Sequence, residues 1–180
     1  YNLTAAIGAV HMTSDKSLDE ICEVVEDFAG VSGRMETISQ NPYIIVDFAH
    51  TPDGMKEVFD SFAHKEIIVV FGAGGNRDKE KRPLMGRVAS NYAKHIIVTS
   101  DNPRFEDPDL IIEDILRGIA DKSKVEVEIN RKLAIKKAIE LYNENCVILI
   151  LGKGDEEAQI IYDKKMPFSD KEVVKEFITI

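Results

Sequence analysis

Residues 66–75 read Glu-Ile-Ile-Val-Val-Phe-Gly-Ala-Gly-Gly, a short apolar run rich in β-branched residues that ends in a glycine-rich segment. Such a run is typical of a strand buried on both faces, and such glycines are typical of a loop that approaches a ligand closely. Similar runs alternate with stretches of helical periodicity, at Tyr43–Phe48, His95–Thr99, Val125–Ile129 and Cys146–Leu151. The alternation predicts an α/β, Rossmann-like, doubly wound sheet of about five parallel strands.

The two ends of the chain carry different signals. Ser17-Leu-Asp-Glu20 has the pattern of a helix capping box, and glycines at positions 30 and 33 end the helical periodicity that follows it. Near the other end, Gln159–Tyr162 and Met166–Phe168 flank a charged turn and predict a C-terminal hairpin. We therefore expect a short helical segment, residues 1–33, and a sheet domain, residues 34–180.

Charge and hydropathy argue against two classes of partner. Acidic residues number 32 against 23 basic ones, a net charge of -9, and no basic stripe is present that could follow a nucleic-acid backbone. The apolar runs are far shorter than the roughly 20 residues that a membrane-spanning helix needs, and no signal peptide is recognisable. We expect a cytoplasmic monomer that contacts neither nucleic acid nor membrane.

Two sets of residues with chemical potential are interpreted as structural. Cys22 and Cys146 both lie in apolar periodic segments, so we expect two buried, reduced thiols. The stretch Asn130–Lys137, led by Arg131 and Lys132, is interpreted as a capped helix with a solvated basic face. No group of Cys or His residues has the spacing of a metal site.

Polar and glycine-rich segments follow four of the five predicted strands. In a parallel sheet the carboxyl ends of the strands lie at one edge, and ligands bind outside that edge. We therefore expect these segments to meet in one site. They are Asp47–Asp53, Phe71–Pro83, Asp101–Arg104 and Gly152–Glu156.

The second of these segments indicates an anionic ligand. Its glycines can expose a row of backbone N–H donors. The basic residues that follow are Arg77, Lys79, Lys81 and Arg82. A nicotinamide-cofactor site is a weaker alternative, because the spacing is Gly-x-Gly-Gly rather than Gly-x-Gly-x-x-Gly and follows the second predicted strand.

The third segment, Asp101-Asn-Pro-Arg104, has the groups that a zwitterionic amino acid requires. Asp101 can hold an ammonium, and Arg104 can bind a carboxylate through two hydrogen bonds. The alternative is a tight turn in which Asp101 or Asn102 bonds its own backbone. Glu156 can add a second ammonium site or can lie in the solvated first turn of a helix. His50 can polarise a phosphate or hold an aromatic base, and can equally be a structural histidine.

Five segments in this order resemble the motifs of MurE-type Mur ligases, the UDP-N-acetylmuramoyl-tripeptide synthetases. They are Gly33–Glu36, Asp47–Asp53, Phe71–Gly86, Asp101–Arg104 and Gly152–Glu156. The resemblance covers nearly the whole chain. It implies that residues 1–33 are the tail of a central ATPase domain and that residues 34–180 are the C-terminal, amino-acid-binding domain.

The resemblance further implies an ATP- and Mg²⁺-dependent carbon–nitrogen ligase that adds meso-diaminopimelate to UDP-N-acetylmuramoyl-L-alanyl-D-glutamate in peptidoglycan synthesis. Arg104 is implied to select diaminopimelate over lysine, whose side chain has no second carboxylate. Arg34, Asp47 and His50 are implied to lie near ATP. No catalytic residue or metal ligand is assigned in this chain. The residues implied to bind the amino acid are Arg77, Asp101, Asn102, Pro103, Arg104, Gly152 and Glu156.

The sequence departs from the family pattern at three positions. The family has Tyr, Cys and His where this chain has Phe48, Ala73 and Asp155. The chain opens at Tyr1 and contains no Gly-x-x-Gly-Lys-Thr-type phosphate loop, so we expect a fragment that needs its own N-terminal and central domains, holds no cofactor alone and does not catalyse ligation. The alternatives are a lysine-adding or folylpolyglutamate-synthetase-like ligase domain, and a non-catalytic binding module of the same fold.

Overall fold

The computed structural model describes residues 2–178, which form two compact units, residues 1–30 and 31–180. The first unit holds helices α1 (Asn2–Thr13) and α2 (Leu18–Glu26). The predicted capping box is confirmed, because Ser17 Oγ accepts a hydrogen bond from Glu20 N at 3.2 Å and Ser17 N donates to Glu20 Oε2 at 2.9 Å. These bonds satisfy backbone N–H groups that the start of a helix leaves unpaired.

The two cysteines differ in environment. Cys146 is buried as expected, but the expectation for Cys22 was wrong, because its side chain is exposed. Ile21 is the buried residue of α2. Helical spacing identifies an apolar stripe on a helix, and the packing of the unit decides how much of that stripe is covered.

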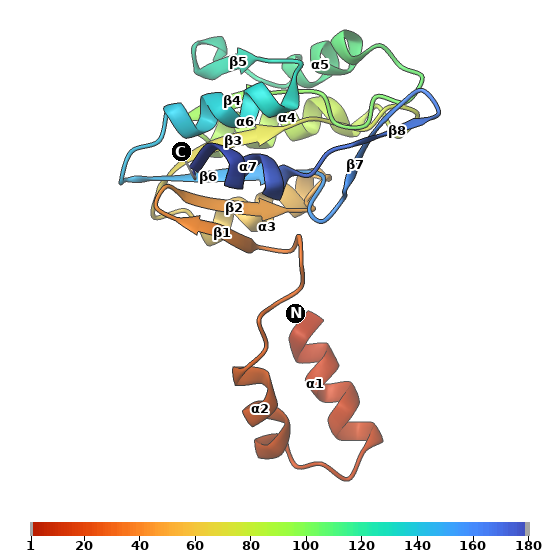
Figure 1. Ribbon diagram of the computed structural model, residues 1–180, viewed down its shortest axis with the longest axis vertical. Helices are drawn as coiled ribbons and strands as arrows, with labels where there is room; N and C mark the ends of the chain where they lie inside the picture. The colour runs from red at the N-terminus through yellow and green to blue at the C-terminus, as the bar shows by residue number, and fades with distance from the viewer. Residues whose placement is uncertain (1, 179–180) are drawn as a thin grey trace. The chain divides into compact units, whose positions relative to one another are not determined.

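The second unit is built on a six-stranded sheet with the order β1-β2-β6-β3-β4-β5 (Figure 1). Its strands are β1 (Glu36–Gln40), β2 (Tyr43–Asp47), β3 (Glu66–Phe71), β4 (His95–Val98), β5 (Val125–Val127) and β6 (Cys146–Leu151). β2 to β6 are mutually parallel, which confirms the five predicted parallel strands. β1 was not predicted; it pairs antiparallel with β2 at the edge of the sheet.

Helices cover both faces of this sheet, as a doubly wound fold requires (Figure 1). Helices α3 (Pro52–Ser61), α4 (Lys81–Tyr92) and α5 (Pro108–Leu116) pack on one face. Helices α6 (Arg131–Glu140) and α7 (Asp170–Ile178) pack on the other, and a short 3₁₀ helix, η1 (Lys122–Lys124), precedes β5. The predicted start of α3 is confirmed: Thr51 Oγ1 accepts from Gly54 N at 3.1 Å, and Pro52 begins the helix.

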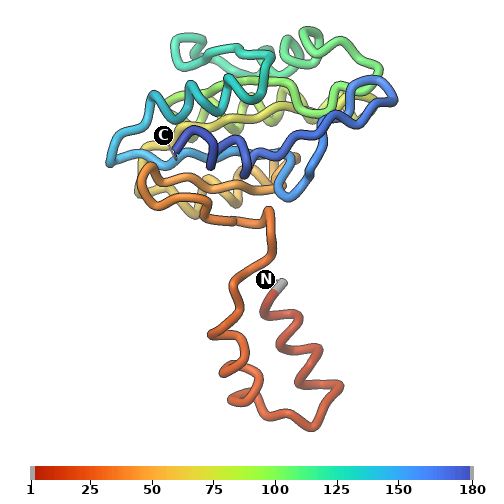
Figure 2. Tube along the Cα trace, in the orientation of Figure 1, coloured from red at the N-terminus to blue at the C-terminus, as the bar shows by residue number. Residues whose placement is uncertain are grey.

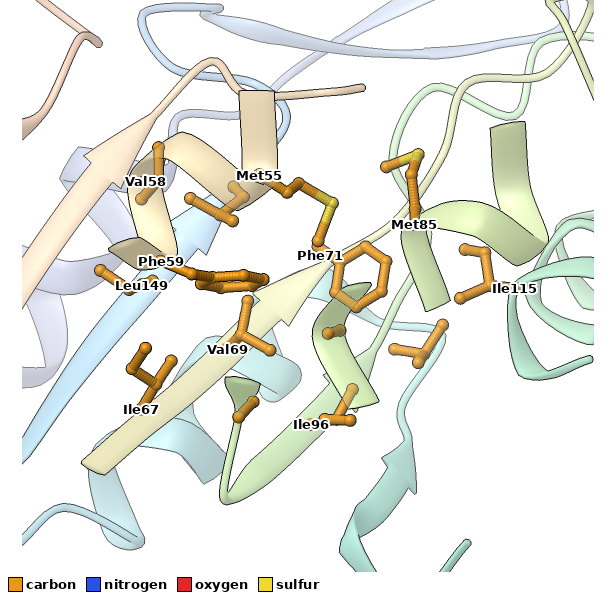
Figure 3. Close-up of a cluster of buried hydrophobic side chains, with 14 of the residues drawn as sticks. Met55, Val58, Phe59, Ile67, Val69, Phe71, Met85, Ile96, Ile115 and Leu149 are labelled. Atoms are coloured by element: carbon orange, nitrogen blue, oxygen red, sulfur yellow. The ribbon is translucent and has the colours of Figure 1, made fainter. Parts of the chain in front are cut away.

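Alternate residues of β3 pack into the hydrophobic clusters on the two opposite faces of the sheet. Ile67, Val69 and Phe71 belong to the cluster under α3, α4 and α5 (Figure 3), whereas Ile68 and Val70 belong to the cluster under α6 and α7. All five are at most 2% exposed. Burial of each such side chain contributes about 1.5–3 kcal/mol, so the uninterrupted apolar run in the sequence is the direct signature of a two-faced strand.

The predicted hairpin is confirmed as β7 (Ala158–Ile161) and β8 (Lys164–Pro167). It lies beside the loop that follows β4, although about 60 residues separate the two in the sequence (Figure 2). Arg104 N donates to Ile160 O at 3.0 Å, and Tyr162 N donates to Arg104 O at 2.7 Å. The hairpin therefore fixes the backbone of the Asp101–Arg104 loop.

The interpretation of α6 as a helix with a solvated basic face was partly wrong. Asn130 caps the helix as expected, and Lys132 is half-exposed. Arg131, however, is 1% exposed, and its Nε and Nη2 donate to the two carboxylate oxygens of Asp170 in α7 at 2.7 and 2.8 Å. Its burial depends on a carboxylate 39 positions away in the sequence.

Helices in the described part of the chain are short. Among residues 2–178, none is long and apolar enough to span a bilayer.

Candidate functional site

A cavity of about 230 Å³ lies at the carboxyl edge of the sheet. Its walls come from the loops that follow β2, β3, β4 and β6, the four segments that the sequence predicted to meet. β6 enters the sheet between β2 and β3, and an open α/β sheet binds ligands where the strand order changes direction in this way. The lining residues are Phe48, His50, Gly72, Ala73, Gly74, Arg77, Lys81, Asp101, Asn102, Arg104, Gly152 and Glu156.

The structure brings together all but one of the residues predicted to bind the amino acid. Pro103 is the exception: it lines an adjoining groove on the other side of the loop. Its carbonyl oxygen faces Gly75, where an added Cβ would lie 1.9 Å from it. Pro103 therefore shapes the loop through its backbone contact with Gly75.

Two glycines are required by the close approach of these loops. Gly75 N donates to Asn102 O at 2.9 Å, a contact that leaves no room for a side chain at position 75. Gly152 has φ +114°, and a Cβ there would lie 2.8 Å from Asp101 Oδ2. Left-handed backbone and close packing both favour glycine, so the glycines that follow β3 and β6 bring the loops into contact.

The Asp101 carboxylate combines both roles that were considered for it. Its Oδ1 accepts from Asn102 N at 2.6 Å, which is the turn-forming bond of the alternative interpretation. The residue also lines the cavity, and its Oδ2 lies 3.9 Å from Nη1 of the buried Arg131. That Nη1 has no hydrogen-bond partner among the described residues. The turn and the ligand-facing role are compatible.

Arg104 is held in an unusual backbone conformation at the rim of the cavity. Its φ is +52°, a left-handed value that non-glycine residues adopt rarely and at a cost. Bonds to the hairpin hold it there, and its Nη1 donates to Gly75 O at 2.9 Å. Within residues 2–178, its Nε and Nη2 meet no acceptor. These two nitrogens form one edge of the guanidinium, the geometry that binds a carboxylate through two parallel hydrogen bonds.

The partly exposed Glu156 forms a hydrogen-bond network with the buried side chains of Asn102 and Lys153. Glu156 Oε2 accepts from Lys153 Nζ at 2.7 Å and from Asn102 Nδ2 at 2.9 Å. Burial raises the pKa of Glu156, but the hydrogen bonds from Lys153 and Asn102 outweigh it, so the pKa lies below its ordinary value and the group is ionised at neutral pH. Glu156 lies in a loop, so the interpretation as the first turn of a helix was wrong.

The basic residues after β3 separate into two pairs. Arg77 and Lys81 line the cavity. Arg82 is 1% exposed and bonded to Glu106 and Asp114, and Lys79 pairs with Glu106 at 3.0 Å. The expectation that all these cations face an anion was therefore wrong for the second pair, whose charge is neutralised within the protein.

Lys81 carries a lowered pKa, because partial burial disfavours its charged form more than Asp78 and Asp101 favour it. Its Nζ donates to His50 O at 2.9 Å. This bond links the loop after β2 to the start of α4.

A second hollow of about 230 Å³ adjoins the first and contains Arg34, Asp47 and His50, the set predicted to lie near ATP. Asp47 accepts from Met35 N and Ala49 N, both at 2.7 Å, so its carboxylate fixes the two loops. Arg34 Cζ lies 4.1 Å from the centroid of the Phe48 ring, and the centroid of the His50 ring lies 4.8 Å from that of the same Phe48 ring. His50 is exposed, and its Nδ1 lies 3.0 Å from Phe48 O.

In the range from 2 to 178, no group of three or more His, Cys, Asp or Glu side chains converges as metal ligands do. Asp155, where the motif departs from its usual His, is exposed and does not line the cavity.

The sequence interpretation missed two groups that support the site. Lys153 is 0% exposed and Arg131 is 1% exposed, and both lie directly behind cavity residues. A lysine between two glycines in a conspicuous motif was a signal for the first. No pattern in the sequence around Arg131 distinguished it from an exposed residue, because its burial depends on Asp170, 39 positions away.

Comparison with known proteins agrees with this geometry. Residues 33–154 match the family described as Mur ligase, glutamate ligase domain. The chain belongs to the Mur ligase family. The matched residues include the four loops of the cavity up to Gly154.

Named relatives and a solved structure support the assignment of the chain to this family. The UDP-N-acetylmuramoyl-L-alanyl-D-glutamate--2,6-diaminopimelate ligase of Wolinella succinogenes is 55% identical over 174 residues, which are 97% of this chain and 40% of the relative. A solved structure of a ligase with the same name is 36% identical, with a TM-score of 0.77, over 99% of this chain and 37% of that one. The chain thus spans about two fifths of the length of these Mur ligases.

A more distant solved structure shows the fold alone. Folylpolyglutamate synthase of Mycobacterium tuberculosis, solved with ADP and AMPPCP, is 20% identical with a TM-score of 0.55, over 68% of this chain and 30% of that one.

Proposed function

We propose that this chain is the C-terminal, amino-acid-binding domain of an ATP-dependent ligase that adds meso-diaminopimelate to UDP-N-acetylmuramoyl-L-alanyl-D-glutamate in peptidoglycan synthesis. The names of its relatives support the reaction. The observation that carries the proposal is the pairing of charges in one cavity: guanidinium groups at Arg77 and Arg104, and carboxylates at Asp101 and Glu156. Diaminopimelate has two carboxylates and two amino groups, so it complements this set.

The residues of this chain act by binding and orienting the amino acid. Arg104 offers its free Nε–Nη2 edge to one carboxylate, and Arg77 offers its guanidinium to the other. Asp101 and Glu156 attract the amino groups. The bound amine then attacks the carboxyl carbon of the nucleotide-linked dipeptide after ATP has converted that carboxylate to an acyl phosphate. The new C–N bond forms, the C–O bond to phosphate breaks, phosphate leaves and the amine gives up a proton.

ATP and Mg²⁺ are proposed to be held mainly by parts of the enzyme outside this chain. Among the described residues, no cluster of three or more His, Cys, Asp or Glu side chains could hold a metal ion. Arg34 and His50, in the hollow beside the cavity, are the residues that would approach the nucleotide when the domains close. We propose the same division for the chain, with residues 1–33 ending the ATPase domain and residues 34–180 forming the amino-acid-binding domain, in a cytoplasmic, monomeric enzyme.

The test is amino-acid preference in the full-length enzyme. We expect kcat/KM for meso-diaminopimelate to exceed that for L-lysine at least 100-fold, because lysine would leave a guanidinium without its carboxylate. Arg104→Lys should raise KM for diaminopimelate about 10–100-fold, since a point charge replaces a two-bond contact, and leave KM for ATP unchanged. Equal or better use of lysine contradicts the specificity, and a full-length protein that ligates neither amino acid indicates a binding module instead.

A further inference from the structure

Lys153 has an unusual environment for a lysine. Its side chain is completely buried in the loop that follows β6, between the Asp101–Arg104 loop and the hairpin. Its Nζ donates to Asn102 Oδ1 at 3.1 Å, to Glu156 Oε2 at 2.7 Å and to Ala158 O at 2.7 Å. An ammonium has three hydrogens, so these acceptors satisfy it completely. The buried charge is thereby compensated and does not contact the cavity, which Lys153 does not line.

The contacts of Lys153 determine which way the Asn102 amide faces. Asn102 Oδ1 receives hydrogen bonds from Lys153 Nζ and from Ile160 N, the latter at 2.8 Å. Both partners can only donate, so the opposite orientation would place the amide NH₂ group against two donors. Asn102 Nδ2 must therefore point toward Glu156, to whose Oε2 it donates at 2.9 Å.

This orientation leaves one hydrogen-bond acceptor and one hydrogen-bond donor available to a ligand. Glu156 Oε2 is occupied by Lys153 and Asn102, whereas Oε1 has no partner among the described residues. Asn102 Nδ2 has two hydrogens, of which Glu156 takes one, and within the same described range the other has no acceptor. A free carboxylate oxygen accepts from an ammonium, and a free amide N–H donates to a carboxylate. These are the two ends of an α-amino acid.

We propose that Lys153 is a positioning residue of the amino-acid site: it fixes the Asn102 amide and the Glu156 carboxylate in the orientation that binds the zwitterionic group. This inference rests on the proposed function. It differs from a role in holding the hairpin alone, which the bond to Ala158 O would serve, because only positioning predicts an effect confined to the amino-acid substrate.

The experiment uses the full-length enzyme and Lys153→Met, which retains most of the volume but removes the charge and the donors. We expect KM for the amino acid to rise at least tenfold while KM for ATP and for the nucleotide-linked dipeptide changes less than twofold. Lys94→Met is the matched control, because Lys94 is half-exposed, pairs with Glu66 at 2.6 Å and does not line the cavity. It should leave all the Michaelis constants unchanged.

A double-mutant cycle separates positioning from general stability. In an Asn102→Ala background, Lys153→Met should raise KM for the amino acid by a smaller factor than in the wild-type background, because one of the two groups that it orients is already gone. Fully multiplicative effects, or a lowered melting temperature with unchanged KM, would overturn the proposal.

Asn102→Asp provides a second route if Lys153→Met does not yield folded enzyme. It keeps the acceptor for Lys153 and Ile160 but sets a second carboxylate oxygen against Glu156, so KM should rise at least tenfold. A rise below twofold contradicts the proposal. Wild-type enzyme is first assayed with meso-diaminopimelate and with L-lysine, and the accepted substrate is used throughout. Preference for lysine contradicts only the proposed specificity, whereas ligation of neither overturns both proposals.

Discussion

Six arginines and lysines near the carboxyl edge of the sheet form two groups with opposite environments. The closed group, Arg82, Arg131 and Lys153, is at most 1% exposed, and each member is paired with a carboxylate of the same chain. The open group, Arg77, Lys81 and Arg104, lines the cavity, and in the described part of the chain none of its members has a salt bridge. Arg77 and Arg82 are five positions apart in one basic segment and belong to different groups. Positive charge in a motif therefore indicates an anion site only where the protein leaves that charge unpaired.

The largest expected effect comes from breaking the closed group. Arg131→Met leaves Asp170, which is 0% exposed, as an unpaired buried charge, and we expect the free energy of unfolding to fall by about 3–5 kcal/mol. Denaturation by urea measures this change. Arg131→Met with Asp170→Leu should recover most of the loss, because no charge then remains buried. The neighbouring Lys132→Met should cost under about 0.5 kcal/mol, since that pair is exposed to solvent. A loss below about 1 kcal/mol for the first variant would contradict the comparison.

An intermediate effect should appear as a dependence of stability on pH. Hydrogen bonds from Arg82, opposed by burial, lower the pKa of Glu106 to about 2. A carboxylate with a lowered pKa in the folded state stabilises the protein above its unfolded pKa, near 4.5, and loses that contribution as pH falls toward about 2. The unfolding free energies of wild type and Glu106→Gln should therefore differ by about 3 kcal/mol at pH 6 and converge near pH 2. A constant difference between pH 6 and pH 2 would show that the Arg82 pair does not act in this way.

The smallest expected effect concerns an exposed charge beside the open group. Asp155 departs from the family motif but does not line the cavity. Asp155→His in the full-length enzyme should change KM for the amino acid less than twofold, because solvent screens an exposed side chain that does not reach the ligand. A change of tenfold or more would place position 155 in the site.

Local sequence patterns predicted the strands that are buried on both faces, because continuous β-branched runs such as Glu66–Phe71 have few other interpretations. The same patterns missed β1, whose sequence Glu-Thr-Ile-Ser-Gln is polar. An edge strand packs less of its surface, so its composition approaches that of a loop. The antiparallel pairing of β1 depends on the neighbouring β2, and no pattern within five residues encodes it.

The cavity itself was more predictable than the groups behind it. The carboxyl ends of parallel strands must share an edge, so topology alone brought Arg77, Asp101 and Glu156 together. The burial of Arg131 and Lys153 depends on partners that only the folded chain supplies. In the sequence, Arg131 and Lys153 stand in surroundings that are typical of solvent-exposed helix and loop residues.

The position of β6 also has a consequence for synthesis of the chain. β6 is the last strand of the six to leave the ribosome, yet it separates β2 from β3. Until residue 151 is available, the inner edges of β2 and β3 have no permanent neighbour, and exposed apolar edges promote aggregation. Premature termination before β6 should therefore yield an insoluble product, because the inner edges of β2 and β3 would then stay unpaired.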